Sequence, residues 1–218
     1  MDEGFRVHEN EYDGSKPGRD IEYYIMRDNL KTTQSLNKTG QDWDNLYKPG
    51  HLHGDWLDSQ TEIKDAVDIG SGTGWFANYL TSYKNFENVI GIEPTQAAID
   101  IGKKIHDNEN ITYLCGFAEN ILPTIELNNK TLFTTFIVLS HIPDIVVKKI
   151  LKNMDAIAPK GSVFIFNENY GTDFHMRMWH CRTKKWWEEN LSNWTISYDD
   201  RPRPDLKIYQ QGLMGIKK

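Results

Sequence analysis

The chain has 218 residues, 39% of them hydrophobic and 26% charged, and its formal net charge is -6 at pH 7. This length is enough for one domain with a substantial core and too short for two of ordinary size. No apolar run reaches the roughly eighteen residues of a membrane-spanning helix, and the excess of negative charge disfavours a nucleic acid as partner. We therefore expect a chain that acts on a small molecule, as a monomer or a homodimer.

The N-terminal residues and the cysteines indicate the compartment. Residues 1–20 lack the basic start and apolar stretch of a secretory signal peptide, so we expect a cytoplasmic chain. Cys115 and Cys181 suit that compartment, and neither has a second Cys or a His at metal-ligand spacing. We predict two reduced thiols, with no disulfide and no structural zinc. The short basic run RTKK at 182–185 is interpreted as a solvated helix face.

Residues 1–60 are polar, with glycine and proline punctuation, which is typical of an N-terminal arm and cap. Their end, WDNLYKPGHLHGDW, is interpreted either as a lid over a small polar substrate or as a helix whose tryptophans pack on the sheet. Its His-x-His pair lacks a firm third ligand, so we expect no metal. The candidate lid residues are Trp43, Tyr47, His51, Asp55 and Trp56, and His53 is a candidate catalytic residue.

The stretch DAVDIGSGTGWFANYL predicts a strand ending at Ile69, a glycine-rich turn and a helix from about Thr73. Gly70, Gly72 and Gly74 permit positive φ angles and let the backbone approach a ligand closely. The free N–H groups at the start of the helix would face the polar part of that ligand. A nucleotide-like cofactor is the expected occupant.

The turn differs from the dinucleotide fingerprint G-x-G-x-x-G, because Trp75 stands where that pattern has its third glycine. The pattern is instead D-x-G-x-G-x-G. A second predicted strand, NVIGIEP, finishes with Glu93, 19 residues after Gly74. An acidic side chain there can accept hydrogen bonds from both hydroxyls of a ribose. The two features together are far more specific than either one alone.

From residue 61 to 168, short β-branched runs alternate with helical patterns, which is typical of βαβ units and a parallel sheet. Thr95 and Asp144 are expected to cap two of the helices. The last two strands, WTISY and LKIYQQGLMGI, are joined by a short link and should be antiparallel. We predict an α/β fold: a Rossmann-like, seven-stranded, mainly parallel sheet with a C-terminal antiparallel hairpin and helices on both faces. This domain would span 61–218, after an N-terminal helical cap at 1–60.

The ordered motifs VDIGSGTG, VIGIEP, FAENI, FIVLSHIPD and APKGSVFIF resemble those of the class I S-adenosylmethionine-dependent methyltransferases, over residues 63 to 168. The resemblance implies S-adenosyl-L-methionine as cofactor and S-adenosyl-L-homocysteine as product. It implies that Asp68 and the glycine turn surround the methionine and ribose portions, and that Glu93 binds the ribose diol. Residues 117–119 would line the adenine. The full set of candidate cofactor-binding residues is Asp68, Gly70, Ser71, Gly72, Gly74, Glu93, Pro94, Phe117, Ala118, Glu119, Leu139 and Ser140.

Two positions depart from the family pattern. Phe117 stands where the family often places an Asp for the adenine amino group, so that hydrogen bond would come from Glu119, from backbone or from water. Thr134 stands where an Asp is frequent in the fourth strand, and we expect this change to affect packing more than catalysis.

Methyl transfer is an in-line displacement at the carbon bound to a sulfonium, so the protein must align the acceptor, exclude water and, for a hydroxyl, help to remove its proton. Ligands of such sheets lie beyond the carboxyl ends of the strands, where His141 and Glu168 are expected. His141 is interpreted as a general base or as a hinge whose ring bonds to backbone, and we favour the hinge. Glu168 is a second candidate catalytic residue, or else a surface carboxylate.

The region after residue 168 combines aromatic and hydrogen-bonding side chains that suit a sugar or a planar acceptor. Trp186 and Trp187, with Leu191 at helical spacing, fit burial against the sheet better. We favour a hydroxyl acceptor on a small polar molecule such as a sugar. The candidate substrate residues of this region are His175, Arg177 and Trp179.

Three other functions stay open: N-methylation of a small molecule, an S-adenosylmethionine-binding module without catalysis, and a nicotinamide-dependent oxidoreductase. The last is the least favoured, because the chain offers no separate substrate domain. Its Tyr-x-x-x-Lys pattern, Tyr12 to Lys16, also precedes the glycine turn.

Overall fold

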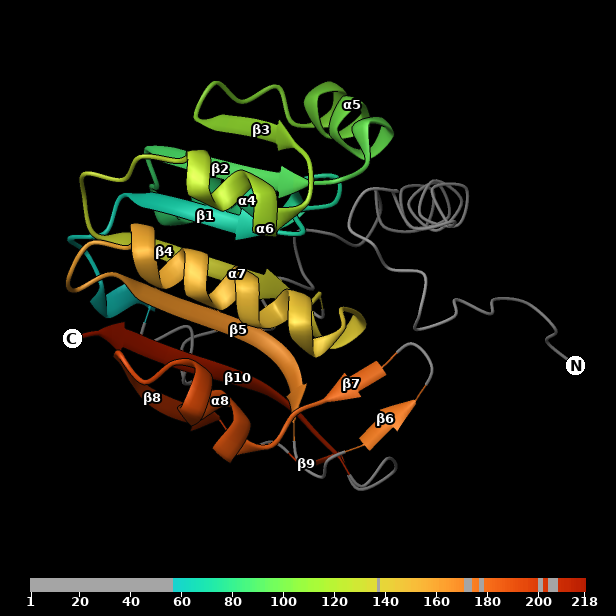
Figure 1. Ribbon diagram of the computed structural model, residues 1–218. Helices are drawn as coiled ribbons and strands as arrows, with labels where there is room; N and C mark the ends of the chain where they lie inside the picture. Colours follow the sequence, from blue (N-terminus) through green and yellow to red (C-terminus); the bar gives the residue numbers. More distant parts are fainter. Residues whose placement is uncertain (1–56, 137, 171–173, 177–178, 200–201, 204–207) are drawn as a thin grey trace, which may run out of the picture.

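The computed structural model (Figure 1) describes residues 57–136, 138–170, 174–176, 179–199, 202–203 and 208–218. The predicted cap at 1–60 lies almost wholly outside the described residues. The same holds for its candidate lid residues and for His53, so the choice between a lid and a packed helix stays a prediction.

Strands and helices alternate along most of the described chain. The helices are α4 (Trp75–Lys84), α5 (Gln96–Ile105), α6 (Ala118–Ile121), α7 (Asp144–Ile157) and α8 (Lys184–Asn190), with short 3-10 turns η2 (Leu122–Thr124) and η3 (Leu139–His141). The strands are β1 (Asp65–Ile69), β2 (Asn88–Glu93), β3 (Ile111–Cys115), β4 (Thr131–Phe136), β5 (Val163–Tyr170), β6 (Phe174–Met176), β7 (Trp179–Cys181), β8 (Trp194–Asp199), β9 (Pro202–Arg203) and β10 (Ile208–Lys217).

The main sheet has the spatial order β3-β2-β1-β4-β5-β10-β8, with β9 beside β10. Strands β1 to β5 pair in parallel, whereas β10 is antiparallel to both β5 and β8. This confirms the predicted sheet and its C-terminal antiparallel pair. The strand order reverses between β1 and β4, and open α/β sheets bind ligands at such a reversal, beyond the carboxyl ends of the strands. That edge of the parallel strands is at the right of Figure 1.

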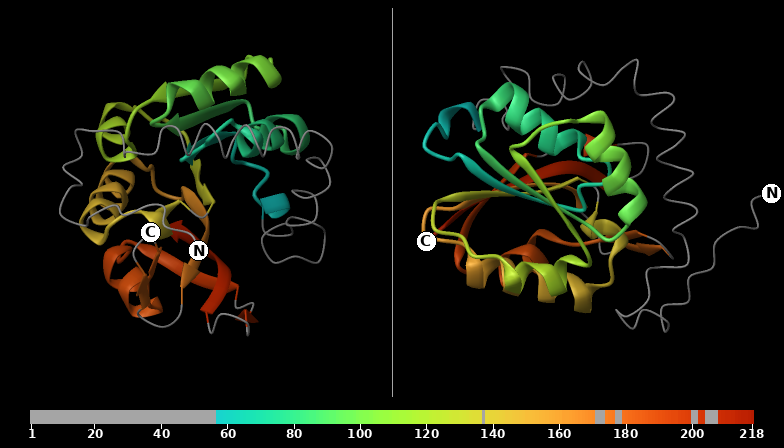
Figure 2. Two further views of the ribbon diagram at one scale, coloured as in Figure 1. Left: turned by 90° about the vertical axis from the view of Figure 1, so that its right-hand side faces the viewer. Right: turned by 90° about the horizontal axis from the view of Figure 1, so that it is seen from above.

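Helices cover both faces of the sheet, α4 and α5 on one and α6, α7 and α8 on the other (Figure 2). On the first face, Phe76 and Leu80 of α4 are buried against the strands. On the second, α7 buries Val146, Ile150 and Met154, which are spaced four residues apart along one side of the helix. Each such side chain contributes about 1.5–3 kcal/mol when it leaves water, so the two apolar layers hold the helices to the sheet.

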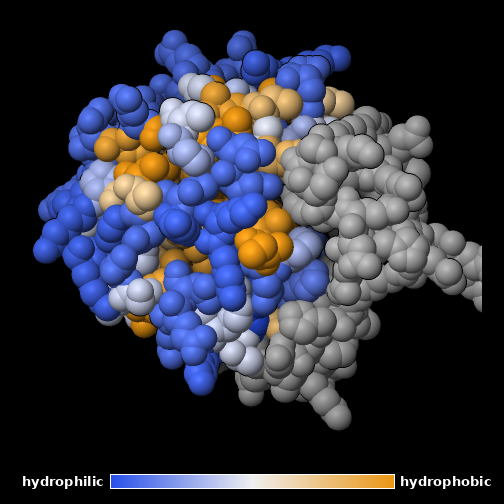
Figure 3. All heavy atoms as spheres, in the orientation of Figure 1, coloured by the Kyte–Doolittle hydropathy of each residue, from blue (hydrophilic) through white to orange (hydrophobic). Residues whose placement is uncertain are grey.

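The surface in Figure 3 is mostly hydrophilic over the described residues, and its apolar side chains form separate small groups. Within the described ranges, no helix combines the length and the apolar sequence needed to cross a bilayer.

Two expected helix starts need correction in detail. Helix α4 begins at Trp75 rather than at about Thr73, because Gly74 before it has a left-handed φ of 76°. Thr95 is the N-cap residue of α5, as expected from its position, but its side chain makes no capping hydrogen bond.

The prediction that Asp144 caps α7 is wrong. Asp144 is the first residue of that helix, Pro143 is its N-cap, and no side chain caps it. Asp144 instead accepts a hydrogen bond from Nε of Arg182 at 2.9 Å. The interpretation of the run 182–185 as a solvated face is also wrong for Arg182, which is 2% exposed. Both local predictions failed for the same reason: Asp144 and Arg182, 38 residues apart in the chain, bind each other.

A small hairpin outside the main sheet was not expected from the sequence. Strands β6 and β7 pair antiparallel, with His175 opposite His180. The hairpin leads directly into Arg182 and α8. Trp187 and Leu191 are 0% and 1% exposed, which confirms the predicted burial of this aromatic helix.

Gly215 of β10 generates a prediction about the sheet. It lies opposite Phe164 of β5, and a Cβ added to it would lie 2.2 Å from Cε1 of that ring. The ring packs against Trp194 with the centroids 5.2 Å apart and has no room to retreat. We predict that Gly215→Ala lowers the free energy of unfolding by about 1–3 kcal/mol in equilibrium urea denaturation.

The matched control for that variant is Ile216→Thr, one residue further along the same strand. Ile216 is 43% exposed, so its replacement should change the free energy of unfolding by no more than about 0.5 kcal/mol. Equal losses in the two variants would contradict the packing argument.

Candidate active site

The glycine turn after β1 is bound to the end of β2. Gly70, Gly72 and Gly74 all have positive φ angles, of 74°, 55° and 76°. The N–H groups of Gly70 and Ser71 donate to the carbonyl oxygen of Ile92 at 2.8 and 3.0 Å. A Cβ at Gly72 would meet nothing within 4 Å, so the turn presents its middle glycine to open space.

Glu93 joins the second strand to this turn. Its Oε2 accepts the N–H of Gly72 at 3.0 Å, and its Oε1 accepts the N–H of Thr95 at 3.0 Å. Glu93 is only 8% exposed, whereas Pro94 after it is exposed. The two sequence motifs that were singled out are therefore in direct contact, and Glu93 both shapes the turn and lies beside its open middle.

Asp68 lies beneath the turn and is 3% exposed. Thr134, opposite it on β4, donates its hydroxyl hydrogen to Oδ1 of Asp68 at 2.8 Å. Burial raises the pKa of Asp68 to about 7, against the hydrogen bond from Thr134 and with a smaller contribution from the charge of Glu93. Thr134 was expected to affect packing, and its contact is instead a polar one with a candidate cofactor residue.

Tyr113 of β3 lies behind the turn and was missed in the sequence. A Cβ at Gly74 would lie 1.8 Å from its hydroxyl oxygen, and one at Gly102 would lie 3.1 Å from the same atom. A Cβ at Gly91 would lie 3.2 Å from its ring. Gly74 is thus required by the packing of Tyr113 as well as by its backbone angle. The available signal was the recurrence of glycine on β2 and α5.

Three buried hydroxyl groups at this edge have no hydrogen-bond partner among the described residues. They belong to Ser71, Tyr113 and Ser140. Buried polar atoms are rarely left unpaired in proteins, so each is a candidate contact for a ligand or for water. Ser71 and Ser140 were both predicted to line the cofactor.

The predicted adenine segment lies at the start of α6. Phe117 is the N-cap residue of that helix, and its carbonyl oxygen accepts the N–H of Asn120 at 2.9 Å. Ala118 is buried, and the carbonyl oxygen of Glu119 accepts Nδ2–H of Asn153 on α7 at 2.8 Å. The segment is therefore fixed to α7, and its contact with adenine stays a prediction.

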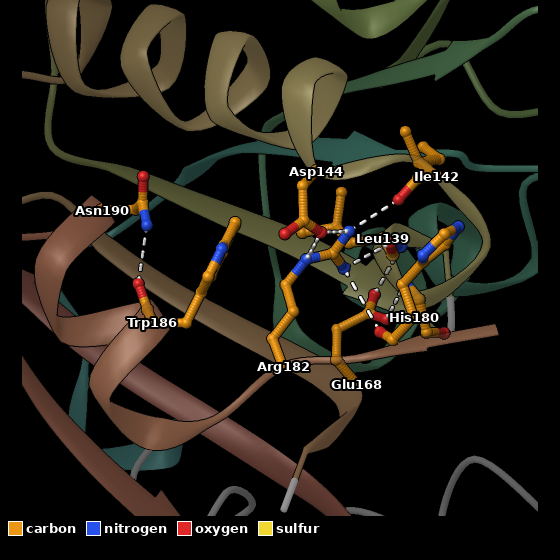
Figure 4. A network of polar contacts seen from close by, with 9 residues as sticks. Leu139, Ile142, Asp144, Glu168, His180, Arg182, Trp186 and Asn190 are labelled. Carbon is orange, nitrogen blue, oxygen red and sulfur yellow. Dashed lines mark hydrogen bonds and ion pairs between the residues drawn. The ribbon is translucent and has the colours of Figure 1, made fainter. Parts of the chain in front are cut away.

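The loop after β4 brings the remaining candidates together. Leu139 and Ser140 are completely buried, whereas His141 is exposed. Glu168 is also completely buried, so the alternative of a surface carboxylate is wrong. Its carboxylate accepts backbone N–H groups of this loop, including those of Leu139 and Ser140 at 3.0 and 2.9 Å (Figure 4). The fold thus brings both candidates to one short segment, with Glu168 buried and His141 exposed.

Sequence reasoning missed Arg182 as a residue of this site. Its guanidinium lies under the same loop and donates to the carbonyl oxygens of Leu139 and Ile142 (Figure 4). It stacks at 4.9 Å from the ring centroid of Trp186. Burial lowers the pKa of Arg182, while the charges of Asp144 and Glu168 oppose that shift. No sequence pattern distinguishes this arginine from a surface one.

The candidate substrate residues of the C-terminal region are only partly described. His175 and Trp179 are placed by their backbone in β6 and β7, and Arg177 lies outside the described residues. Among the described side chains, no three of His, Cys, Asp or Glu gather closely enough to hold a metal ion.

Comparison with known proteins agrees with this geometry. Residues 67–166 match the family model described as a methyltransferase domain. An S-adenosylmethionine-dependent methyltransferase from Anabaena variabilis is 15% identical, over 73% of this chain and 79% of its own, with a TM-score of 0.57. CalS10, an amino pentose methyltransferase from Micromonospora echinaspora, is 12% identical over 75% and 88%, with a TM-score of 0.59.

A third structure, DhpI in complex with SAH, is 14% identical over 91% of this chain and 94% of its own, with a TM-score of 0.60. No curated protein matches the chain. At such identities the structures establish the fold alone, and the family match adds the domain. Residues 67–166 are therefore a methyltransferase domain, and the fold around them is the one found in S-adenosylmethionine-dependent methyltransferases of known structure.

The raised pKa of Asp68 predicts how stability depends on pH. In the folded protein this carboxyl keeps its proton up to about pH 7, whereas the unfolded chain loses it at its ordinary pKa of 3.8. The folded state then holds more protons than the unfolded state between these values, so this group lowers the free energy of unfolding as the pH rises through that window.

Asp68→Asn removes this titration and keeps an oxygen acceptor for Thr134. We predict that the variant gains stability relative to the cofactor-free wild type as the pH rises from 4 to 7, by up to about 4 kcal/mol, since each pKa unit is worth about 1.36 kcal/mol. Urea denaturation at a series of pH values measures the difference. A difference that is constant over this range would contradict the assignment.

Proposed function

We propose that this chain transfers the methyl group of S-adenosyl-L-methionine to a small polar acceptor in the cytoplasm, with a hydroxyl group as the favoured target. The observation that carries the proposal is the contact between Glu93 and the N–H of Gly72. It sets an acidic side chain beside an open glycine turn at the point where the strand order reverses, which suits an adenosyl group.

The residues present fit this cofactor. Gly72 leaves space above the turn, and the unpaired hydroxyl of Ser71 lies on the other side of the turn, against Gly91 of β2. Glu93 would accept hydrogen bonds from the ribose hydroxyls, and Asp68 would lie near the methionine portion. Leu139 and Ser140, both buried, would lie beneath it. The bound cofactor supplies the activated methyl group and its leaving group.

The protein's own part in the reaction is to hold the acceptor in line, exclude water and accept a proton where the acceptor is a hydroxyl. His141 is exposed at the carboxyl edge of the sheet and can be reached by an acceptor. Its backbone N–H donates to the carbonyl oxygen of Val138 at 3.0 Å, so the backbone of this residue shapes the turn, whereas the hinge was predicted through its ring. We favour the hinge, with the acceptor's proton passing to water or to a group of the N-terminal region.

The acceptor is proposed from the polar and aromatic residues of the sequence at 43–56 and after residue 168. CalS10, which shares the fold, acts on an amino pentose, so both O- and N-methylation of a sugar-like molecule are consistent with the scaffold. A small-molecule N-methyltransferase is therefore the second candidate. A cofactor-binding module without catalysis is distinguished by the absence of turnover with labelled methyl donor and pooled acceptors.

Two glycine variants test the cofactor site. Gly72 and Gly161 both have positive φ angles, and Gly161 lies in the turn before β5, at the opposite edge of the sheet. Alanine at either position costs about 1–3 kcal/mol of backbone strain. We predict that Gly72→Ala weakens binding of S-adenosyl-L-homocysteine at least tenfold in calorimetry, because the new methyl group enters the cofactor's space. Gly161→Ala, the matched control, should bind as the wild type does.

Failure of the wild-type protein to bind S-adenosylmethionine or its demethylated product would refute the proposed cofactor site. Binding of NAD in the same assay would instead support the oxidoreductase. Equal binding by the two glycine variants would show that the cofactor does not lie over the turn.

A substitution of His141 separates the hinge from the general base. We predict that His141→Ala keeps the affinity for the cofactor and lowers kcat less than tenfold, because the contact that shapes the loop comes from the backbone N–H of residue 141. Steady-state kinetics and calorimetry on the same preparation measure both quantities. A fall in kcat of more than a hundredfold with unchanged cofactor affinity would identify His141 as the base.

A further inference from the structure

Two buried side chains of opposite charge hold the loop 138–142, between β4 and α7 (Figure 4). We propose that Glu168 and Arg182 are positioning residues that fix this loop, and with it His141 and the floor beneath the cofactor. The inference rests on the proposed function and deepens it, because it gives Glu168 a role other than that of a general base.

Glu168 accepts hydrogen bonds from the backbone N–H groups of three successive loop residues. Its Oε1 accepts from Val138 and Leu139, each at 3.0 Å, and its Oε2 accepts from Ser140 at 2.9 Å. The hydroxyl of Thr135 adds a fourth hydrogen bond at 2.7 Å. Glu168 is 0% exposed, so both oxygens face protein donors rather than an acceptor molecule. Hydrogen bonds to an ionised group are roughly twice as strong as neutral ones, which makes this an effective anchor.

Arg182 donates hydrogen bonds to two backbone carbonyl oxygens of the same loop. Its Nη1 donates to Leu139 at 2.7 Å and its Nη2 donates to Ile142 at 2.6 Å. Nε and Nη2 both lie 2.9 Å from Oδ1 of Asp144, and the guanidinium stacks on Trp186. A planar fork of five N–H donors can serve two carbonyl groups and a carboxylate at once. A lysine carries its three donors on one nitrogen and cannot reproduce the spacing of this planar fork.

The two charges act on the same loop residue. The N–H of Leu139 donates to Glu168, and its carbonyl oxygen accepts from Arg182. The other N–H groups of the loop, at residues 141 and 142, bond to carbonyl oxygens within it. Every backbone N–H of 138–142 thus has a protein acceptor, although loops usually leave many of theirs to water. The C-terminal part of the chain, through Arg182, therefore sets the position of a loop beneath the cofactor.

The effect of Glu168 and Arg182 on the loop position can be separated from their effect on the stability of the fold. Removing either charge leaves the opposite charge buried with less compensation, which destabilises a protein. Removing both charges avoids that penalty but still leaves the loop without its anchors. A double variant can therefore recover stability without recovering the loop geometry.

The first experiment compares Arg182→Lys and Glu168→Gln with the wild type in kcat, KM and cofactor affinity. We expect kcat to fall about ten- to a hundredfold, because small misplacements of reacting groups cost that much. The cofactor affinity should fall by less than kcat does, because Glu93 and the glycine turn are untouched and only the loop beneath the cofactor loses an anchor. Lys185→Met is the control: it removes a positive charge from an exposed residue of α8 and should leave kcat unchanged.

The second experiment uses Glu168→Gln with Arg182→Met in one chain. We expect its thermal unfolding midpoint to exceed that of Arg182→Met alone, while kcat stays as low as in the single variants. Recovery of kcat together with the midpoint would reduce the two residues to a structural role and overturn the proposal. Wild-type kcat in Arg182→Lys would overturn it as well.

The third measurement needs neither a variant nor turnover. In amide hydrogen exchange of the cofactor-free wild type, the amides of Val138, Leu139 and Ser140 should be protected to the same degree as those of β4. The reason is that a buried carboxylate accepts their N–H groups. Exchange of these three amides at the rate of an unprotected loop would refute the proposed anchoring of the loop by Glu168. A wild type that shows this protection and yet neither binds the cofactor nor transfers a methyl group would refute the proposed function. The anchoring of the loop would still be supported in that case.

Discussion

The structure around the active site depends on the hydrogen bond from the N–H of Gly72 to the carboxylate of Glu93. Within the glycine turn, the N–H of Gly74 bonds to the carbonyl oxygen of Ser71, whereas the N–H groups of Gly70, Ser71 and Gly72 need acceptors from the neighbouring strand. Glu93 supplies one from the neighbouring strand and accepts Thr95 with its other oxygen. The end of β1 and the start of α5 are thereby fixed by one side chain, beside the open face of the turn.

The same solution occurs a second time, with two strands of the sheet in between. Glu168 at the end of β5 accepts the N–H groups of the β4–α7 loop, and Arg182 binds its carbonyl groups. Two carboxylates on the carboxyl edge thus order the two loops between which the cofactor is proposed to bind. Buried charges are costly, and here Glu93 accepts two backbone N–H groups, whereas Glu168 accepts three together with the hydroxyl of Thr135. Asp68, with its raised pKa, is the buried acid with fewer such contacts.

Much of the fold could be predicted because its signals are local. The strand before Gly70, the antiparallel pair at the C-terminus and the burial of Trp187 follow from alternation, short links and helical spacing. Contacts between distant residues could not be predicted in this way. Tyr113 behind the turn and Arg182 under the loop carry no local pattern, and Asp144 was assigned to a cap because local rules do not include an arginine 38 residues away.

The sequence by itself determined the order of the elements, the glycine turn and the acidic residue that ends β2, because each depends on neighbours in the chain. Only the tertiary structure decided what these groups contact: that Glu93 binds the turn, that Thr134 donates to Asp68, and that Glu168 is buried in a loop anchor. The physical reason is that hydrogen bonds and burial depend on distance in space. The sheet, by aligning the carboxyl ends of its parallel strands, brings together residues that the chain keeps apart.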